Sequence, residues 1–315
     1  MRTLTSMRIV LGLGVLLSAA GCGGGSNASN GSTTPTAPPA IPSQGPGALQ
    51  ELNPSTGALG SATLDPIYAD VPARILVSPE ILLFRRVEAG SSLQGSVPGS
   101  LGAQPGEGQQ LQTVATFELG TTEVTQAQWT ALATVAGRSG SDLAPWLQIT
   151  PATSIGAITT GPTLPAYGLS VDLIAAVLTG FNAYQGTGRP HLRLPTAVEW
   201  EHACRAGSSA RYAWGEDESQ ATASRYAVVR ETRPGDGVSP VAGVGSLPRL
   251  PNALGFYDME GNVWEPVSNT LGPDAVLRGG SWGDEPQRTR SADRDFSVPS
   301  VRNDGLGFRP ARMLP

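Results

Sequence analysis

The oxygen-bearing side chains of one short segment, Gly261-Asn262-Val263-Trp264-Glu265, are candidates for metal binding. Ca2+ takes roughly six to eight oxygen ligands from carboxylates, amides and backbone carbonyls. The side chains of Asn262 and Glu265, with carbonyl groups near Gly261 and Val263, therefore predict a calcium site on a single loop. The alternative is structural: Asn262 caps the turn and Glu265 pairs with an arginine such as Arg278.

Thiols and imidazoles are too scarce for a soft metal centre. The chain has two cysteines, Cys22 and Cys204, and two histidines, His191 and His202. A zinc or copper cluster needs several such ligands close together. Cys204 falls on the apolar side of a predicted short helix, so we expect a buried, unreactive thiol.

The first residues are typical of a secretory signal. Arg2 and Arg8 precede an apolar run over residues 9–20, and small residues lead to Gly21 and Cys22. We expect residues 1–21 to be a signal peptide and Cys22 to be lipidated, as in a bacterial lipoprotein. The protein would then be exported and held on a membrane, periplasmic or at the cell surface, through the lipid alone. An ordinary cleaved signal with an incidental cysteine is the alternative.

Composition divides the rest of the chain. Residues 22–64 are rich in Gly, Ser, Thr and Pro and predict a disordered tether, because they cannot bury enough apolar area to offset their ordering entropy. Residues 65–315 suffice for one large domain. The net charge is -5, no lysine occurs, and no basic stripe is visible, which argues against nucleic-acid binding.

Local patterns in the domain predict a few strands and three helices. Residues 79–95 are expected to form a strand, a turn and a strand, and residues 113–119 a further strand. One helix should begin after Thr125, with Trp129 on its buried face, and a second should run from Ser170 to residue 183. A third should open at Thr196, where Glu199 completes a capping box.

Five blocks of this domain resemble the formylglycine-generating enzyme (sulfatase-modifying factor) family. They are residues 193–201, residues 252–259, Gly261-Asn262-Val263-Trp264-Glu265, residues 276–282 with Gly279-Gly280-Ser281-Trp282, and Gly307-Phe308-Arg309. The resemblance implies an α+β fold of the C-type-lectin-like kind, with small twisted sheets, a few helices and long ordered loops. Calcium at the Gly-Asn-Val-Trp-Glu block is also a property of the family.

The resemblance makes one substitution informative. Active members use two cysteines to bind copper and oxidise a cysteine of a sulfatase, and at those positions this chain has Asp284 and Thr289. A carboxylate and a hydroxyl do not replace the thiolates that Cu(I) prefers. Copper and formylglycine formation are therefore not expected.

The same resemblance places Arg278, Ser281, Trp282, Asp284 and Thr289 in the ligand groove. Arg278, like Arg309, is expected to serve structure rather than catalysis. The polar region 281–309 then suggests a binding or scaffold module for a protein or a small ligand. The alternatives are an enzyme of different chemistry on the same groove and a formylglycine-generating enzyme with an atypical active site.

Overall fold

The computed structural model describes residues 49–62, 79–149, 160–187, 189, 191–232, 243–244 and 249–313. The chain divides into two compact units, residues 1–37 and 38–315, and every described residue belongs to the second. The predicted signal peptide and Cys22 lie outside the described residues. Within the described ranges, no helix is both long and apolar enough to cross a membrane.

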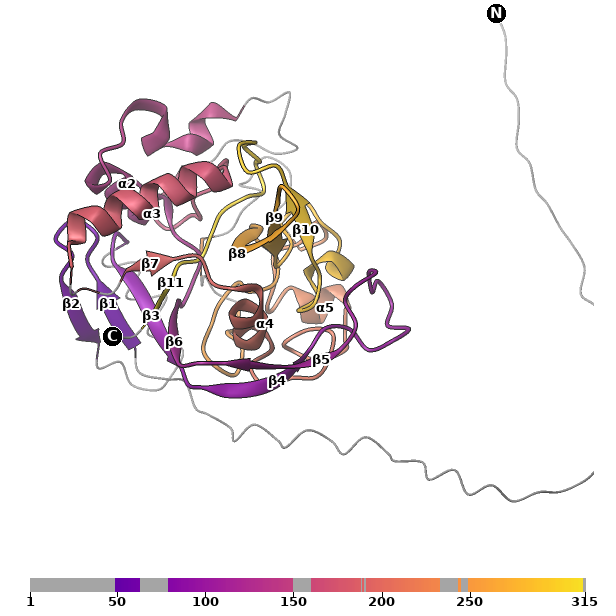
Figure 1. The fold of residues 1–315 in the computed structure, drawn as a ribbon. Coiled ribbons are helices and arrows are strands. Elements are labelled where there is room, and N and C mark those ends of the chain that lie inside the picture. The colour runs from indigo at the N-terminus through magenta and orange to yellow at the C-terminus, as the bar shows by residue number, and fades with distance from the viewer. Residues whose placement is uncertain are drawn as a thin grey trace, which may run out of the picture. The chain divides into compact units, whose positions relative to one another are not determined.

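The largest sheet has six strands in antiparallel pairs (Figure 1). Its order is β2 (Leu59–Ala62), β1 (Leu49–Leu52), β3 (Leu82–Val87), β6 (Phe117–Gly120), β11 (Ala311–Met313) and β7 (Leu192–Arg193). The last strand, β11, lies between β6 and β7. The C-terminal part of the chain is therefore held in the same sheet as its first described strands.

Two expectations for this region were wrong. Residues 49–62 were expected in the tether, but they form β1 and β2, and β1 pairs with β3 while burying Leu49 and Leu52. The strand, turn and strand expected over residues 79–95 are present as β3 and β4 (Gly90–Gln94), although the two do not pair with each other: β3 pairs with β1 and β6, and β4 pairs with β5 (Gln110–Val114). The strand expected over 113–119 is divided between β5 and β6, which belong to different sheets.

A three-stranded sheet carries the region that the sequence singled out. Its order is β10 (Asp295–Ser297), β9 (Asp274–Arg278) and β8 (Glu265–Leu271), again antiparallel. Strand β8 begins at Glu265 and β9 ends at Arg278, and these two residues are paired. The sheet therefore brings the predicted metal loop and the Gly-Gly-Ser-Trp turn to one edge.

The three predicted helices are present with their predicted caps. They are α2 (Gln126–Val135), α3 (Val171–Gln185) and α4 (Ala197–Arg205), capped by Thr125, Ser170 and Thr196. Thr196 and Glu199 form the expected capping box. The short elements are α5 (Gln220–Ala223), η1 (Gly140–Leu143), η2 (Pro145–Gln148) and η3 (Pro286–Thr289).

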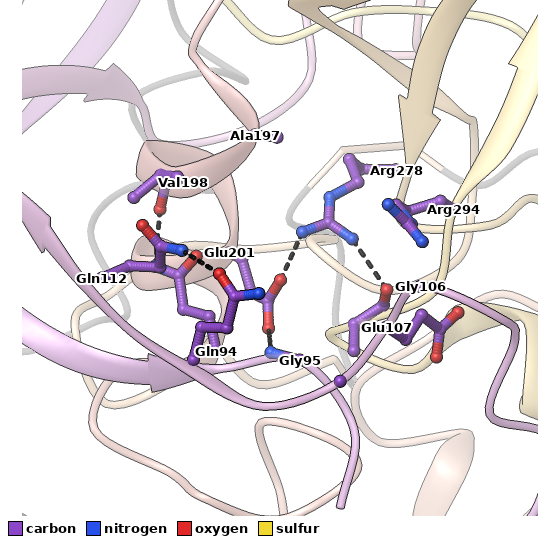
Figure 2. A pocket seen from close by; sticks show the side chains of 13 residues that line it. Gln94, Gly95, Gly106, Glu107, Gln112, Ala197, Val198, Glu201, Arg278 and Arg294 are labelled. Atoms are coloured by element: carbon purple, nitrogen blue, oxygen red, sulfur yellow. Dashed lines mark hydrogen bonds and ion pairs between the residues drawn. The ribbon is translucent and has the colours of Figure 1, made fainter. Parts of the chain in front are cut away.

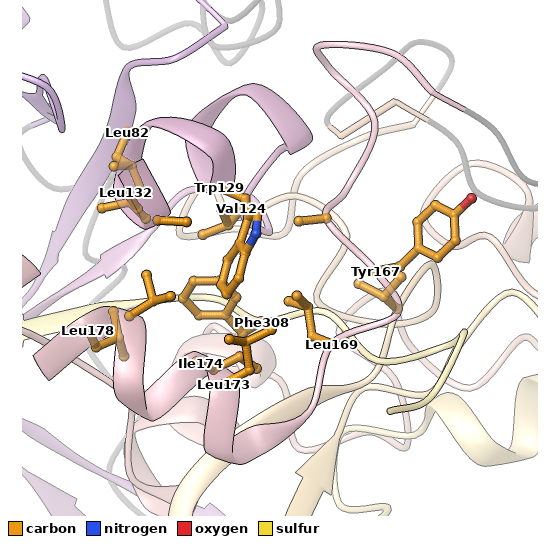
Figure 3. Packing of buried hydrophobic residues seen from close by; sticks show 14 of the residues in the cluster. Leu82, Val124, Trp129, Leu132, Tyr167, Leu169, Leu173, Ile174, Leu178 and Phe308 are labelled. Atoms are coloured by element: carbon orange, nitrogen blue, oxygen red, sulfur yellow. The ribbon is translucent and has the colours of Figure 1, made fainter. Parts of the chain in front are cut away.

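The main hydrophobic core lies between α2, α3 and the C-terminal segment (Figure 3). Trp129 of α2 meets the ring of Phe308 edge-on, with centroids 5.9 Å apart and an interplanar angle of 84°. Such a pair stabilises the fold by roughly 0.5–1.5 kcal/mol beyond the contribution of the area that it buries. A second cluster surrounds Trp200 and Cys204 of α4. The expected α+β class is confirmed.

Candidate functional site

Two glycines fix the turn that follows β9. Gly279 and Gly280 have φ angles of +93° and +77°, which residues other than glycine rarely adopt. A Cβ on Gly280 would lie 2.6 Å from Cγ2 of Thr289. The Gly279 carbonyl accepts a 2.7 Å bond from the N–H of Gly261, so the turn is held against the loop before β8.

Asp284 follows this turn, and one of its carboxylate oxygens is fully engaged. Oδ2 accepts hydrogen bonds from the backbone N–H of Ser281 at 2.9 Å, from Ser281 Oγ at 2.6 Å and from Trp264 Nε1 at 2.9 Å. Charge-assisted bonds of this kind are stronger than neutral ones. Asp284 therefore fastens the Gly-Gly-Ser-Trp turn to the Trp264 side chain.

Thr289 ends η3 and is completely buried. Its hydroxyl donates to the carbonyl of Pro286 at 2.9 Å, and its methyl group packs against Gly280. A neutral, buried hydroxyl with this bond does not supply a thiolate-like ligand. Asp284 and Thr289 therefore close the two ends of the η3 loop, and their donor atoms do not fit copper.

Arg278 lies in a buried ion pair, the kind of contact that a structural role would involve. It donates to the carbonyls of Ala292 and Asp293 at 2.8 and 2.9 Å and to the carboxylate of Glu201, which also binds Arg205 at 2.8 Å. Burial raises the pKa of Glu201, but Arg278 and Arg205 more than offset this, so the pKa is lowered. One carboxylate is therefore shared by two guanidinium groups.

Glu265 pairs with Arg309, not with Arg278. Arg309 reaches both carboxylate oxygens at 2.9–3.1 Å, and Trp200 Nε1 donates to Oε2 at 2.7 Å. Burial raises the pKa of Glu265, while Arg309 lowers it in part. A carboxylate occupied by a guanidinium group and an indole has little capacity left for a cation.

The other residues of the predicted calcium loop are held in place through their N–H groups. Asn262 has a φ of +64° and donates through Nδ2 to Glu123 at 2.5 Å. The backbone N–H of Val263 donates to the other oxygen of Glu123 at 3.0 Å, and that of Gly261 bonds to Gly279. Because Glu265, the one charged ligand of the predicted cradle, is bound by Arg309 and Trp200, the contacts favour the structural interpretation of the loop, and calcium binding here stays a prediction.

The remaining predicted residues are mostly buried. Trp282 belongs to the main core, Ser281 is buried beside Asp284, and only Asp284 is partly exposed. Of the five predicted groove residues, Arg278 lines a cavity, whereas a groove shared by all five stays a prediction.

Cys204 and the histidines are separate features. Cys204 is buried, as expected, and burial raises the pKa of its thiol well above its usual range. His202 is buried against Ser92 Oγ at 2.9 Å, whereas His191 is exposed and bonds to the Gly186 carbonyl at 3.2 Å. Among the described residues, no group of three or more His, Cys, Asp or Glu side chains could hold a metal ion.

Sequence reasoning missed the residues at the centres of these networks. Glu123, which lies just before α2, was not singled out from the sequence, and Glu201 was named only within the block of residues 193–201. Both are buried carboxylates, but a single sequence does not reveal which distant arginine or amide reaches them. Gln110 and Gln112, two residues apart on β5, are a sequence signal for a polar strand face that was not used in the predictions.

The family profile of the sulfatase-modifying factor enzyme 1-like domain matches residues 83–314. This chain therefore belongs to the sulfatase-modifying factor family.

Among curated proteins, it resembles the inactive C-alpha-formylglycine-generating enzyme 2 of Mus musculus, at 34% identity over 131 residues. It also resembles the formylglycine-generating enzyme of Mus musculus (33% over 146 residues) and the hercynine oxygenase of Mycobacterium tuberculosis (34% over 143 residues). Each match covers 38% of this chain and 42%, 38% and 32% of the respective relative. The chain thus spans less than half of the length of these relatives.

Two solved structures extend the likeness to the fold. PvdO from Pseudomonas aeruginosa matches with a TM-score of 0.60 and 27% identity, over 74% of this chain and 94% of that chain. Treponema denticola variable protein 1 matches with a TM-score of 0.57 and 20% identity, over 74% and 96%.

Proposed function

We propose that this domain is a binding or scaffold module of the sulfatase-modifying factor family that does not oxidise cysteine. The observation that carries the proposal is the state of Asp284 and Thr289. One forms three bonds within its own turn and with Trp264, and the other is buried with its hydroxyl bonded to Pro286. The likeness to a relative named as inactive agrees with this proposal.

The proposed recognition surface is the exposed part of residues 281–309. Phe296, Val298 and Val301 are 38%, 53% and 52% exposed on the strand and turn that follow Asp295. The turn is held by backbone bonds from Asp172 to the Pro299 carbonyl at 3.0 Å and from Val301 to the Val298 carbonyl at 3.0 Å. A fixed turn that presents apolar and polar side chains suits a protein or small-ligand partner.

The module would be exported and held at a bacterial membrane by a lipid on Cys22. The basic, apolar and small-residue segments before Cys22 support this part of the proposal.

A copper titration tests the non-oxidase proposal. The purified protein is titrated with Cu(I) against a competing chelator, and the variant Asp284→Cys/Thr289→Cys shows what a thiol pair would add. We expect the wild-type protein to take up no tightly bound copper, because hard oxygen donors bind Cu(I) poorly. Stoichiometric copper in the wild-type protein that persists in Cys204→Ser would contradict the proposal.

A further inference from the structure

The β4–β5 ribbon turns a polar face toward the domain. Gln94 pairs with Gln110, and Ser92 pairs with Gln112 two residues further along each strand. Since alternate side chains share a face, these four polar side chains lie together, and Leu111 on the opposite face is 62% exposed. A ribbon that only covered a core would place its leucines inward. The inverted pattern indicates that the space under the ribbon serves polar contacts.

That space is a cavity of about 200 Å3 between the ribbon, the start of α4 and the segment after η3. Figure 2 shows Arg278 and Arg294 on one side, with Gln94 and Gln112 across from them. Gln94 is fixed by its bond to the Val198 carbonyl at 2.8 Å. The volume equals that of about seven water molecules in the liquid, which suits a small ligand.

The two arginines of this cavity differ in their partners. The guanidinium group of Arg278 is bound by Glu201 and by two carbonyls. That of Arg294 donates one long bond, 3.3 Å, to the Pro105 carbonyl, and its buried Nε has no partner. Among the described residues, no carboxylate forms an ion pair with Arg294. A guanidinium group is shaped to bind an anion through two parallel bonds, so this one is available for a ligand.

The glutamines leave one further donor and one further acceptor. Gln112 Nε2 donates to Gln110 Oε1 at 3.2 Å. Within the described part of the chain, Gln112 Oε1 and Gln110 Nε2 have no other hydrogen-bond partner. Two such groups beside a cation can bind hydroxyl groups of the same ligand.

We propose that this cavity binds a small hydroxylated carboxylate, of the size of one hexuronate, with Arg294 holding the carboxylate and Gln110 and Gln112 binding hydroxyl groups. The carboxylates of Glu107 and Glu201 also line the cavity, but each is already paired with a buried arginine. A single guanidinium group, that of Arg294, is therefore left for the ligand, which suits one carboxylate better than a dianionic phosphate. The inference rests on the proposed function, because it gives the binding module a ligand class at a site that includes Arg294.

Calorimetric titration of the purified full chain with D-glucuronate, D-glucose and inorganic phosphate tests the inference. We expect D-glucuronate to bind in the millimolar range or tighter, and the other two to bind at least about tenfold more weakly, because glucose lacks the carboxylate for Arg294 and phosphate lacks the hydroxylated carbon frame for Gln110 and Gln112. Arg294→Gln should weaken D-glucuronate binding by at least about tenfold. Arg138→Gln, on the loop after α2, is the matched control and should leave binding unchanged.

Gln112→Leu provides a second, independent variant, because it removes one amide without touching charge. It should weaken D-glucuronate binding several-fold while the melting temperature stays near that of the wild-type protein. Absence of D-glucuronate binding, equal binding of glucose or phosphate, or unchanged binding by Arg294→Gln would each overturn the inference. Such a failure with no copper uptake would leave the proposed function standing, whereas copper uptake would remove that function itself.

Discussion

Glu260 is a buried carboxyl group, and the loss of its proton should make the stability of the domain fall as pH rises through neutrality. It accepts hydrogen bonds from the N–H of Ala213 at 3.0 and 3.1 Å and from Ser291 Oγ at 2.9 Å, beside Cys204. Burial raises the pKa of this group from 4.5 to about 8, and the hydrogen bonds offset only part of the rise. The native state therefore holds the proton more tightly than the unfolded chain.

The sign and size of the effect follow from proton linkage. A carboxyl group with a raised native pKa contributes its full stability below pH 4.5 and loses it as pH rises toward 8. The slope approaches about 1.4 kcal/mol per pH unit inside that window, so stability should fall by roughly 2–3 kcal/mol between pH 5 and pH 7. Asp293, whose pKa burial raises to about 7, adds a change of the same sign.

Glu260→Gln isolates the contribution of Glu260, because its carbonyl oxygen can still accept from Ala213 and Ser291 but it cannot ionise. Urea unfolding of both proteins at pH 5, 6, 7 and 8 gives the free energy of unfolding. The difference between wild type and variant should change in the variant's favour as pH rises, by roughly 2–3 kcal/mol from pH 5 to pH 7. Parallel profiles would refute the reasoning.

Three further predictions concern the buried pair, divalent cations and the lipid anchor. Arg309→Leu should lower the free energy of unfolding by about 3–5 kcal/mol because it leaves Glu265 uncompensated, whereas Arg302→Leu, whose partner Asp142 is also partly exposed, should cost less than about 1 kcal/mol. A chelator should leave the melting temperature unchanged, since Arg309 already neutralises Glu265; a fall reversed by Ca2+ would show that the loop rearranges around an ion. Cys22→Ala should release the protein from the membrane fraction, and unchanged partitioning would refute lipidation.

Local sequence patterns predicted the helices, because the start of a helix depends on interactions between neighbouring residues. The helix caps at Thr125, Ser170 and Thr196 depend on a few adjacent residues, and each helix begins where its cap predicted. The burial of Trp200 and Cys204 followed from helical spacing on α4.

Strand partners were not predictable in the same way. Residues 82–94 contain two strands with a short turn, which locally resembles a hairpin. In the structure, however, β3 pairs with β1 and β4 pairs with β5. Strand β1 itself is four residues long and follows a Pro- and Gly-rich stretch, so its buried Leu49 and Leu52 were hidden in the composition of the tether. Pairing depends on packing between distant segments, which a local pattern does not contain.

The candidate site was predictable at its positions but not in its contacts. The sequence identified the loop at Asn262 and Glu265 and the replacement of two cysteines by Asp284 and Thr289. It did not indicate that Asn262 would donate a hydrogen bond to Glu123 or that Arg309 would pair with Glu265, because both partners are more than 40 residues away. Carboxylates near amides suggested calcium, while the fold supplied an amide and a guanidinium group instead.

The central claim, that the domain is not an oxidase, is tested most directly on a peptide substrate. The purified protein is incubated with copper, oxygen and a peptide containing Cys-X-Pro-X-Arg, and the peptide mass is followed over time. We expect the peptide cysteine to stay unconverted, because Asp284 and Thr289 offer no thiolate and Cys204 is buried. Conversion to formylglycine by the wild-type protein, retained in Cys204→Ser, would show that the reaction proceeds without a protein thiol and would contradict the account.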